Sequence, residues 1–362
     1  FTTAGYVLIG AGRLAVEGTI SVDAGKTNSI ASGLFTVAGV SKTGGGALAV
    51  SRCNGPLNVT EGTLLVSSRD TADADISVAG GAALHVLGGP ATSANLIANA
   101  SFEFPALAAG AYSYATASII SNWTVTAFSN LVARENTAIG NTWNSAGAAP
   151  DLNHVLILQY GGSVAQTVTI AADGLYSLSF YHFLRNNYPE TSLNVLLGGA
   201  RLTCFMNQAV QFSNQRYVSA PLFLKAGSYE LRFEGDGGQG DRASIIDLVC
   251  FAPPSEAVAC GALSGLSTLR TATGATVRMA FTGSAPLARV YIDGSLQTAN
   301  TFTSSHTSGI FAGVGSLVSA APQNIYTWTG ASGNWNNTAN WESATVPAGG
   351  QELALRFPLG SS

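Results

Sequence analysis

Side chains that could do chemistry are few in this sequence and do not gather into a catalytic set. Its four histidines lie in three separate stretches without the spacing of metal ligands. Asp236 and Asp241 lie in the glycine-rich stretch EGDGGQGDR, which favours a solvated turn or a loop cation site over the opposed carboxylates of a glycosidase. The stretch LIGAGRLA lacks the third glycine of a dinucleotide-binding loop. We therefore expect that the protein is not an enzyme.

Aromatic side chains in predicted loops indicate a different kind of site. Aromatic rings with polar groups around them hold sugars, and Trp143 in GNTWNSAG and Tyr188 in RNNYPE are expected to lie in loops. The other candidates for this glycan site are Arg134, Tyr160 and Arg185. The alternative is that these loops only cover the ends of a domain or contact a neighbouring part of the protein.

Three of the five tryptophans stand close together in TWTGASGNWNNTANW, residues 327–341. They are Trp328, Trp335 and Trp341. Indoles in a polar frame of Gly and Asn can present a platform for sugars, but they can also plug the end of a β structure. The residues alone leave both readings open.

The four cysteines are Cys53, Cys204, Cys250 and Cys260, and they allow three full pairings. None lies in a CxxC motif. We expect a disulfide that joins Cys250 to Cys204 or to Cys260. The alternative is that the thiols are free and buried.

The composition excludes several classes of partner. Only 10% of the 362 residues are charged, the net charge is −4, and the lysines and arginines form no cluster. Nucleic acids and anionic membrane surfaces need clustered cations, so neither is expected as a partner. No apolar run approaches 18 residues, so we expect no insertion into a membrane. The first residue is Phe1 rather than Met, which indicates a processed chain or a piece of a longer one.

The pattern of the sequence predicts an all-β protein in three parts. Apolar residues alternate with polar ones almost everywhere, and glycines separate the runs. In residues 1–92 and 255–362 the runs are short, as in the rungs of a β-solenoid. In residues 93–254 they are longer, which is typical of an antiparallel sandwich. In the run SYELRFEG, Tyr229, Leu231 and Phe233 are predicted to face one way, toward the core.

The stretch 39–68, GVSKTGGGALAVSRCNGPLNVTEGTLLVSS, resembles the repeat associated with bacterial autotransporter passengers. Lys42 and the glycines and aliphatic residues around it match the first half of that repeat. The resemblance implies a right-handed parallel β-helix in a large secreted bacterial protein. Residues 276–319 look like the tail that closes such repeats. The tryptophan segment looks like the start of a next repeat block, so we expect the three indoles to cap the hydrophobic rungs of the coil.

The middle part is similar to galactose-binding-like jelly rolls, a fold shared by many carbohydrate-binding modules. The matching stretches include NLIANASFEFP (95–105), SNWTV (121–125) and ASIIDLVCF (243–251). The resemblance implies a jelly-roll β-sandwich inserted between the two β-helix segments, in which Trp123 of SNWTV belongs to the core.

In jelly rolls with this start and end, the two ends meet at a structural calcium ion. Glu103 and Asp247 hold those positions, and Leu248 stands where the motif has a second acid. A calcium ion needs six to eight oxygen ligands, so further oxygens would have to contribute. The alternative is that backbone amides or Arg242 satisfy the two carboxylates. Apart from this Ca²⁺ ion we expect no cofactor.

Two hypotheses of function follow. In the first, the chain is a repeating unit of an extracellular fibre on a bacterial surface, and its copies join head-to-tail through the ends of the β-solenoid, in one giant chain or between chains. The jelly roll would then be displayed sideways. In the second, the chain is a carbohydrate-binding adhesin module on a solenoid stalk, and its partner is a glycan.

Overall fold

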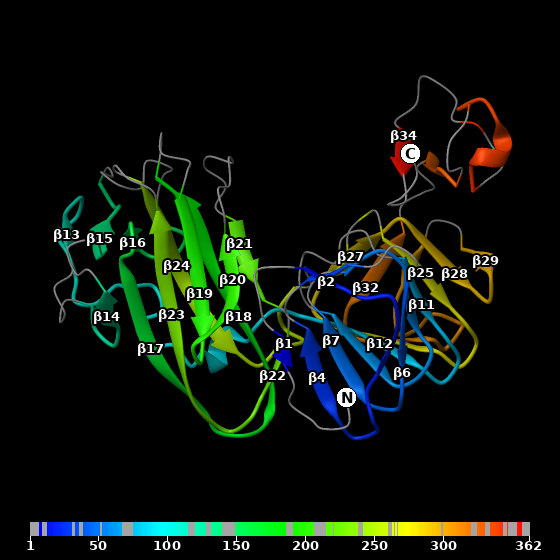
Figure 1. Ribbon diagram of the computed structural model, residues 1–362, viewed down its shortest axis with the longest axis horizontal. Helices are drawn as coiled ribbons and strands as arrows, with labels where there is room; N and C mark the ends of the chain where they lie inside the picture. Colours follow the sequence, from blue (N-terminus) through cyan, green and yellow to red (C-terminus); the bar gives the residue numbers. More distant parts are fainter. Residues whose placement is uncertain are drawn as a thin grey trace. The chain divides into compact units, whose positions relative to one another are not determined.

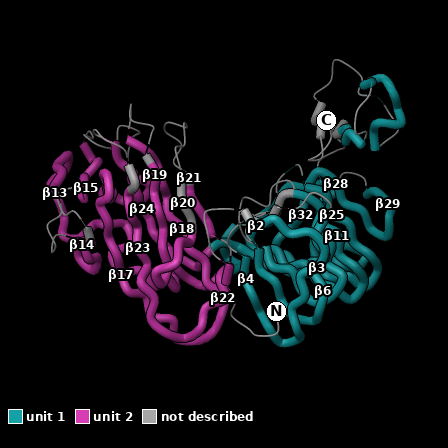
Figure 2. The backbone as a smooth tube through the Cα atoms, in the orientation of Figure 1, with its two compact units in different colours: residues 1–6, 13–89, 255–362 teal, residues 7–12, 90–254 magenta. Residues whose placement is uncertain are grey.

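The computed structural model describes residues 7–8, 13–30, 33–35, 39–50, 53–66, 75–114, 120–127, 132–139, 149–185, 191–205, 215–219, 221–237, 242–259, 263, 265, 267–297, 300–319, 324–329, 334–342, 346 and 353–356. These residues form β-strands and two 3₁₀ turns, Thr92–Ala94 and Thr338–Asn340, so the prediction of an all-β protein is confirmed (Figure 1). None of the described helices is long and apolar enough to span a membrane. The chain divides into two compact units (Figure 2). One contains residues 1–6, 13–89 and 255–362, and the other contains residues 7–12 and 90–254.

The first unit is built from short strands that join three parallel sheets in turn. The first sheet has the order β4 (Thr27–Ile30), β7 (Ala47–Val50), β10 (Thr63–Val66), β12 (Ala83–Leu87), β26 (Thr276–Ala280) and β31 (Phe311–Gly313). The second has the order β3 (Gly18–Ser21), β6 (Val40–Thr43), β9 (Leu57–Val59), β11 (Asp75–Val78), β25 (Thr268–Thr271) and β28 (Arg289–Ile292). The third contains β2 (Arg13–Ala15), β5 (Gly33–Phe35) and β8 (Cys53–Asn54). Strands β27 (Ser284–Leu287) and β32 (Ser316–Ser319) form a further parallel pair. The short strand β1 is Val7–Leu8.

Like residues stack on one another along the inside of these sheets. Leu48, Leu64, Leu84 and Val277 occupy successive partner positions in β7, β10, β12 and β26, and all four are fully buried. Strand β12 pairs with β26 although residues 90–254 separate them in the chain. Because parallel neighbours stack in register, each inward residue lies over the one in the strand before it, and the ladders merge into one hydrophobic core. The right-handed winding that the sequence predicts stays a prediction.

Lys42 is a buried cation in this unit. Its ammonium group donates hydrogen bonds to the carbonyl oxygens of Gly44 and Glu61, the latter at 2.8 Å, and the Glu61 carboxylate accepts the Gly44 N–H at 2.9 Å. Burial lowers the pKa of Lys42, and the charge of Glu61 opposes that shift. The lysine therefore joins the turns that follow β6 and β9.

Replacing Lys42 by Met is expected to destabilise the first unit by about 2 kcal/mol, because hydrogen bonds to a charged group contribute about 1.5–3 kcal/mol and Met keeps the length of the stem. Urea unfolding and hydrogen exchange in β6 and β9 measure the effect. Lys225→Met is the matched control, since Lys225 is exposed, pairs with the exposed Asp173 and otherwise contacts the Phe223 ring at 5.5 Å, so a change within about 0.5 kcal/mol is expected there. Equal effects of the two substitutions would contradict the role assigned to Lys42.

Very short antiparallel strands form the C-terminal edges of two sheets in this unit. Strand β29 (Ser295–Leu296) pairs with β28, and β30 (Thr301–Phe302) pairs with β32. Short edge strands limit the addition of a further strand. These two edges therefore do not favour the head-to-tail stacking that the sequence suggested.

The tryptophan segment forms a small core of its own. Strands β33 (Asn324–Thr327) and β34 (Leu353–Arg356) pair in parallel, and Trp328 and Trp341 are buried together with Tyr326. These side chains belong to a cluster separate from the core of the parallel sheets, which differs from the expected cap over the rungs. Glu342 connects the segment to those sheets through ion pairs with Arg270 at 3.2 Å and Arg289 at 3.9 Å.

The second unit consists of two antiparallel sheets, as the longer alternating runs predicted. The seven-stranded sheet has the order β13 (Tyr112–Tyr114), β15 (Val132–Asn136), β16 (His154–Gln159), β24 (Ala243–Ala252), β18 (Gly174–Leu184) and β21 (Gln215–Val218), and β22 (Leu222–Leu224) also pairs with β18. The five-stranded sheet has the order β14 (Thr124–Ala127), β17 (Ser163–Ile170), β23 (Gly227–Gly237), β19 (Thr191–Leu197) and β20 (Ala200–Phe205).

An aromatic core joins the two sheets of this sandwich. The ring of Phe233 in β23 lies 5.1 Å from that of Phe180 in β18 and 6.0 Å from that of Trp123. All three rings are buried, which confirms the core positions predicted for Phe233 and Trp123.

Candidate functional site

The cross-strand register defines the outer face of the seven-stranded sheet. Residues directly opposite each other in antiparallel strands point to the same side. Ala133 lies opposite Ile157, Ile157 opposite Ile245, and Ile245 opposite Phe183. These side chains form an apolar cluster distinct from the inter-sheet aromatics. By the same register the outer face also carries Glu135 in β15, Asp247 in β24 and Tyr181 in β18.

Two exposed tyrosines lie at the edge of this outer face. Tyr112 and Tyr114 are on the edge strand β13, opposite Glu135 and Ala133 respectively. Their side chains are 47% and 43% exposed, and the two rings meet edge to face at 6.1 Å between centroids. A tyrosine offers an apolar ring and a polar hydroxyl, so the pair presents two ring faces and two hydroxyl groups at one place on the surface.

Beside the tyrosine pair, the acids of the outer face are buried. Glu135 and Asp247 have no exposed surface. Burial raises the pKa of Asp247 to about 8; hydrogen bonds from the backbone N–H groups of Asp151 and Leu248 oppose this shift, and the negative charges of Asp151 and Glu103 add to it. Asp247 is therefore mostly protonated at neutral pH, and neither acid is accessible to a large substrate.

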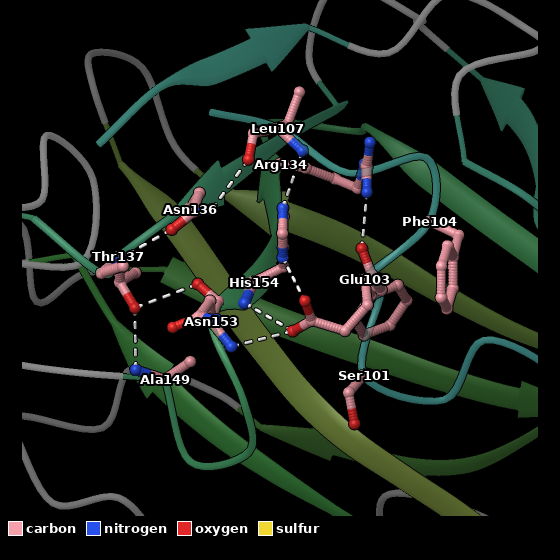
Figure 3. Close-up of polar contacts among 12 residues, drawn as sticks. Ser101, Glu103, Phe104, Leu107, Arg134, Asn136, Thr137, Ala149, Asn153 and His154 are labelled. Carbon is pink, nitrogen blue, oxygen red and sulfur yellow. Dashed lines mark hydrogen bonds and ion pairs between the residues drawn. The ribbon is translucent and has the colours of Figure 1, made fainter. Parts of the chain in front are cut away.

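A polar network on the inner side of the same sheet holds the segment that leads to β13 (Figure 3). One oxygen of the Glu103 carboxylate accepts the backbone N–H groups of Asn153 at 2.9 Å and His154 at 2.8 Å, and the other contacts Nδ1 of His154. Nε2 of His154 accepts the N–H of Leu107 at 3.0 Å, so the ring carries its proton on Nδ1 and donates it to Glu103. The side chain of Asn136 donates to the carbonyl of Leu107 at 2.8 Å.

Arg134 belongs to this network and not to a glycan site. Its guanidinium group donates to the carbonyl oxygens of Phe102 at 2.5 Å and Pro105 at 2.6 Å, and the residue is fully buried. It lies opposite Leu156, on the inner face of β15. The prediction that Arg134 contacts a glycan is therefore wrong, because strand alternation turns it inward.

The other predicted glycan contacts are only partly described. Trp143 and Tyr188 lie outside the described residues. Arg185 follows β18 and is half-buried, and its backbone N–H donates to Ala243 at 3.2 Å. Tyr160 is half-buried in the turn after β16, with a positive φ of 46°. The tyrosines at positions 112 and 114 were not singled out from the sequence, although the Tyr-x-Tyr spacing in GAYSYAT puts both rings on one side of a strand.

The residues predicted to hold calcium are satisfied by other groups. Both Glu103 oxygens accept N–H donors, and the two oxygens of Asp247 accept the N–H groups of Asp151 at 2.9 Å and Leu248 at 2.7 Å. Among the residues that the structure describes, no three His, Cys, Asp or Glu side chains are placed to hold a metal ion. The site therefore does not fit the Ca²⁺ ion that the resemblance implies, and backbone amides take its place.

The prediction that Cys250 forms a disulfide is wrong. Cys250 is a free, buried thiol, and burial raises its pKa to about 11. Such a thiol is mostly protonated and behaves as a small apolar side chain. The side chains of the other three cysteines lie outside the described part of the chain.

Comparisons with known proteins find a likeness of fold at low identity. No family model and no curated protein matches the sequence. The structure is similar to the Stig cyclase Fisc from Fischerella sp. TAU, at 15% identity and a TM-score of 0.35, over 44% of this chain and 96% of that one. It is similar to the carbohydrate-binding module TmCBM61, solved with β-1,4-galactotriose, at 14% identity and a TM-score of 0.33, over 44% of this chain and 98% of that one. It is also similar to the module CBM36, solved with calcium and xylotriose, at 12% identity and a TM-score of 0.25, over 36% of this chain and 94% of that one. At these values the likenesses do not assign the chain to a family.

Proposed function

We propose that the unit of residues 90–254 is a carbohydrate-binding jelly roll and that its edge at Tyr112 and Tyr114 holds a glycan. The observation that carries this proposal is the exposed tyrosine pair on an edge strand, with both rings on the outer face. Sugar rings stack on aromatic faces, and the phenol hydroxyls can bond to sugar hydroxyls. The neighbouring acid Glu135 is buried, so the tyrosine surface favours a neutral glycan over a charged one.

We propose binding without catalysis. Hydrolysis of a glycosidic bond needs two carboxyl groups that reach the same bond from opposite sides. On the described outer face, Glu135 and Asp247 are closed to solvent. We therefore expect a glycan that binds at the two tyrosines to be released without cleavage.

For the first unit we propose a right-handed parallel β-helix that serves as a stalk for the jelly roll outside a bacterial cell. Two features support this arrangement: Leu48, Leu64 and Leu84 stack in register, and one turn of the chain separates each of these strands from the next. The nearly uncharged composition is common among secreted β-rich proteins. The adhesin hypothesis is thus favoured over the fibre hypothesis, since two described C-terminal sheet edges end in short antiparallel strands.

A glycan microarray tests the proposed site with the double variant Tyr112→Ala/Tyr114→Ala. Loss of two stacking rings is expected to weaken binding at least about tenfold, which corresponds to about 1.4 kcal/mol. The matched control is Phe104→Ala, because Phe104 is another exposed aromatic side chain (63%) of the same unit but belongs to no strand of the sheet. Chromatography of the bound glycan after incubation is expected to show no cleavage products.

Three results would contradict the proposal. One is an array on which the unaltered protein binds nothing. Another is binding that survives in the double tyrosine variant and disappears in Phe104→Ala. The third is release of shorter sugars, which would replace a binding function with a catalytic one.

A further inference from the structure

The three clustered tryptophans of the C-terminal segment differ in exposure. Trp328 and Trp341 are 4% and 2% exposed, whereas Trp335 is 48% exposed. The sequence does not distinguish the three tryptophans, since each is flanked by small or polar residues. An indole that served only to fill the small core would be buried as its two neighbours are, because exposing an aromatic ring to water is unfavourable.

The exposed indole of Trp335 packs against the two buried tryptophans. The ring of Trp335 lies 6.3 Å from that of Trp328 and 5.6 Å from that of Trp341, at interplanar angles of 37° and 73°. The indole N–H of Trp341 donates to the Trp335 carbonyl at 2.9 Å, so a buried side chain holds the backbone of the exposed one. The loop around it is also ordered, because the Asn340 side chain donates to the Asn334 carbonyl at 3.1 Å. A ring held in this way loses little conformational entropy when a ligand stacks on it.

The residues that flank Trp335 in the chain are mostly polar and carry no charge. The stretch from Asn334 to Trp341 reads NWNNTANW and contains no Lys, Arg, Asp or Glu. Asn334, Asn336 and Asn337 are exposed, and the Asn336 side chain makes no hydrogen bond with the described residues. Each asparagine amide can both donate and accept, as sugar hydroxyls require.

We propose that Trp335 is the stacking platform of a second glycan site, in the first unit, with Asn336 as its nearest hydrogen-bonding group. The ligand class is a neutral polysaccharide, since residues 334–341 offer an indole face and amide groups and contain no charged side chain. This site is independent of the tyrosine pair, which lies in the other unit. The chain therefore binds glycan at two places, and a polymer that reaches both is held more tightly than a short oligosaccharide.

Native gels that contain a neutral polysaccharide test this proposal directly. The probes are β-1,4-galactan, xyloglucan and mixed-linkage β-glucan, each in a separate gel, and the measured quantity is the retardation of the protein. The starting protein is the variant Tyr112→Ala/Tyr114→Ala, so that the first proposed site contributes nothing. We expect at least one gel to retard this variant and the further substitution Trp335→Ala to reduce the retardation at least fivefold. Leu296→Ala is the control, because Leu296 is a 51% exposed apolar side chain in the same unit.

Folding of the variants is followed by far-ultraviolet circular dichroism and urea unfolding. If Trp335→Ala lowers the unfolding midpoint, Trp335→Tyr keeps an aromatic ring against the buried tryptophans and is expected to reduce the retardation about twofold or more. Retardation that is unchanged by these substitutions overturns the proposal, and so does an absence of retardation in all three gels. The result does not depend on the tyrosine pair: if Tyr112→Ala/Tyr114→Ala leaves binding on the array unchanged and the Trp335 gels succeed, only the first site is lost.

Discussion

Replacing Glu103 by Ala is expected to lower the free energy of unfolding of the second unit by about 3 kcal/mol. The substitution removes the acceptor of three donors: the backbone N–H groups of Asn153 and His154 and the Nδ1–H of His154. His154 is only 3% exposed, so its ring N–H cannot replace the lost hydrogen bond with one to water. A buried donor left without a partner costs about 1–3 kcal/mol, and the two donors of the buried His154 set the expected size, since Asn153 is exposed and its N–H can bond to water.

The design of this experiment separates the network from a general surface effect. Glu103→Gln keeps one carbonyl oxygen and is expected to cost about half as much as Glu103→Ala. Glu230→Ala is the control, because Glu230 is exposed and pairs with the exposed Arg232, so a change within about 0.5 kcal/mol is expected. Urea unfolding and hydrogen exchange in β15 and β16 give the measurements. A loss as small as that of Glu230→Ala would mean that the network does not stabilise the sandwich.

The same substitution is also expected to weaken glycan binding at the tyrosine pair. Asn136 donates its side chain to Leu107 and its backbone N–H to the carbonyl of Ala111 at 2.9 Å, next to Tyr112. The network that Glu103 completes therefore positions the start of β13. Glycan binding that stays intact in a destabilised Glu103→Ala protein would show that β13 is held by its pairing with β15 alone.

Asp247 is expected to contribute less to the stability of the second unit as the pH rises from about 4 to about 8. Its pKa in the folded state is about 8, raised mainly by burial, whereas an unfolded aspartate titrates near 3.8. The folded state therefore binds the additional proton throughout that window, and the stability that this proton contributes is lost as the pH rises through it. The limit is about 1.4 kcal/mol per pH unit for one proton. The side chain of Asn cannot ionise, so the Asp247→Asn variant does not lose stability in this way. Above pH 7 the unaltered protein is therefore expected to be only slightly more stable to unfolding than the variant, or less stable than it.

The comparison must be made between the two proteins, since His182 acts with the opposite sign. Burial lowers the pKa of His182 to about 4, so its contribution to stability rises with pH between about 4 and 6.5 and is the same in both proteins. The profiles are measured once in EDTA and once in CaCl₂. We expect no difference between the two buffers. Parallel pH profiles would contradict the titration of Asp247, and a calcium-dependent gain that disappears in Asp247→Asn would restore a metal site at these carboxylates.

The all-β class and the face of many side chains followed from the sequence alone. In SYELRFEG the alternation placed Leu231 and Phe233 in the core, and both are fully buried. The same holds for the ladder of Leu48 and Leu64 in the repeat-like stretch. Alternation is a property of a single strand with a period of two residues, so a short window of sequence is enough to reveal it.

The candidate sites depended on contacts that no short window contains. Arg134 looked like a ligand contact, yet β15 turns it toward the carbonyls of Phe102 and Pro105, some 30 residues earlier in the chain. Glu103 and Asp247 looked like calcium ligands, yet backbone amides of residues 151, 153 and 154 satisfy most of their oxygens. Apart from the His154 ring, which contacts Glu103, these partners are backbone groups, which every residue carries, so side-chain types could not identify them.

Exposure was decided in the same way by the tertiary structure. Trp335 and Trp341 lie six residues apart and have similar polar neighbours in the sequence. Trp341 is enclosed by Tyr326 and Trp328, whereas Trp335 is about half exposed to solvent. Tyr112 and Tyr114 are open because β13 is the last strand of its sheet, and the order of strands is set by pairings across long stretches of chain. The sequence by itself determined which side of a strand each residue takes, whereas only the tertiary structure decided what lies on that side, since covering a side chain requires surface from distant parts of the chain.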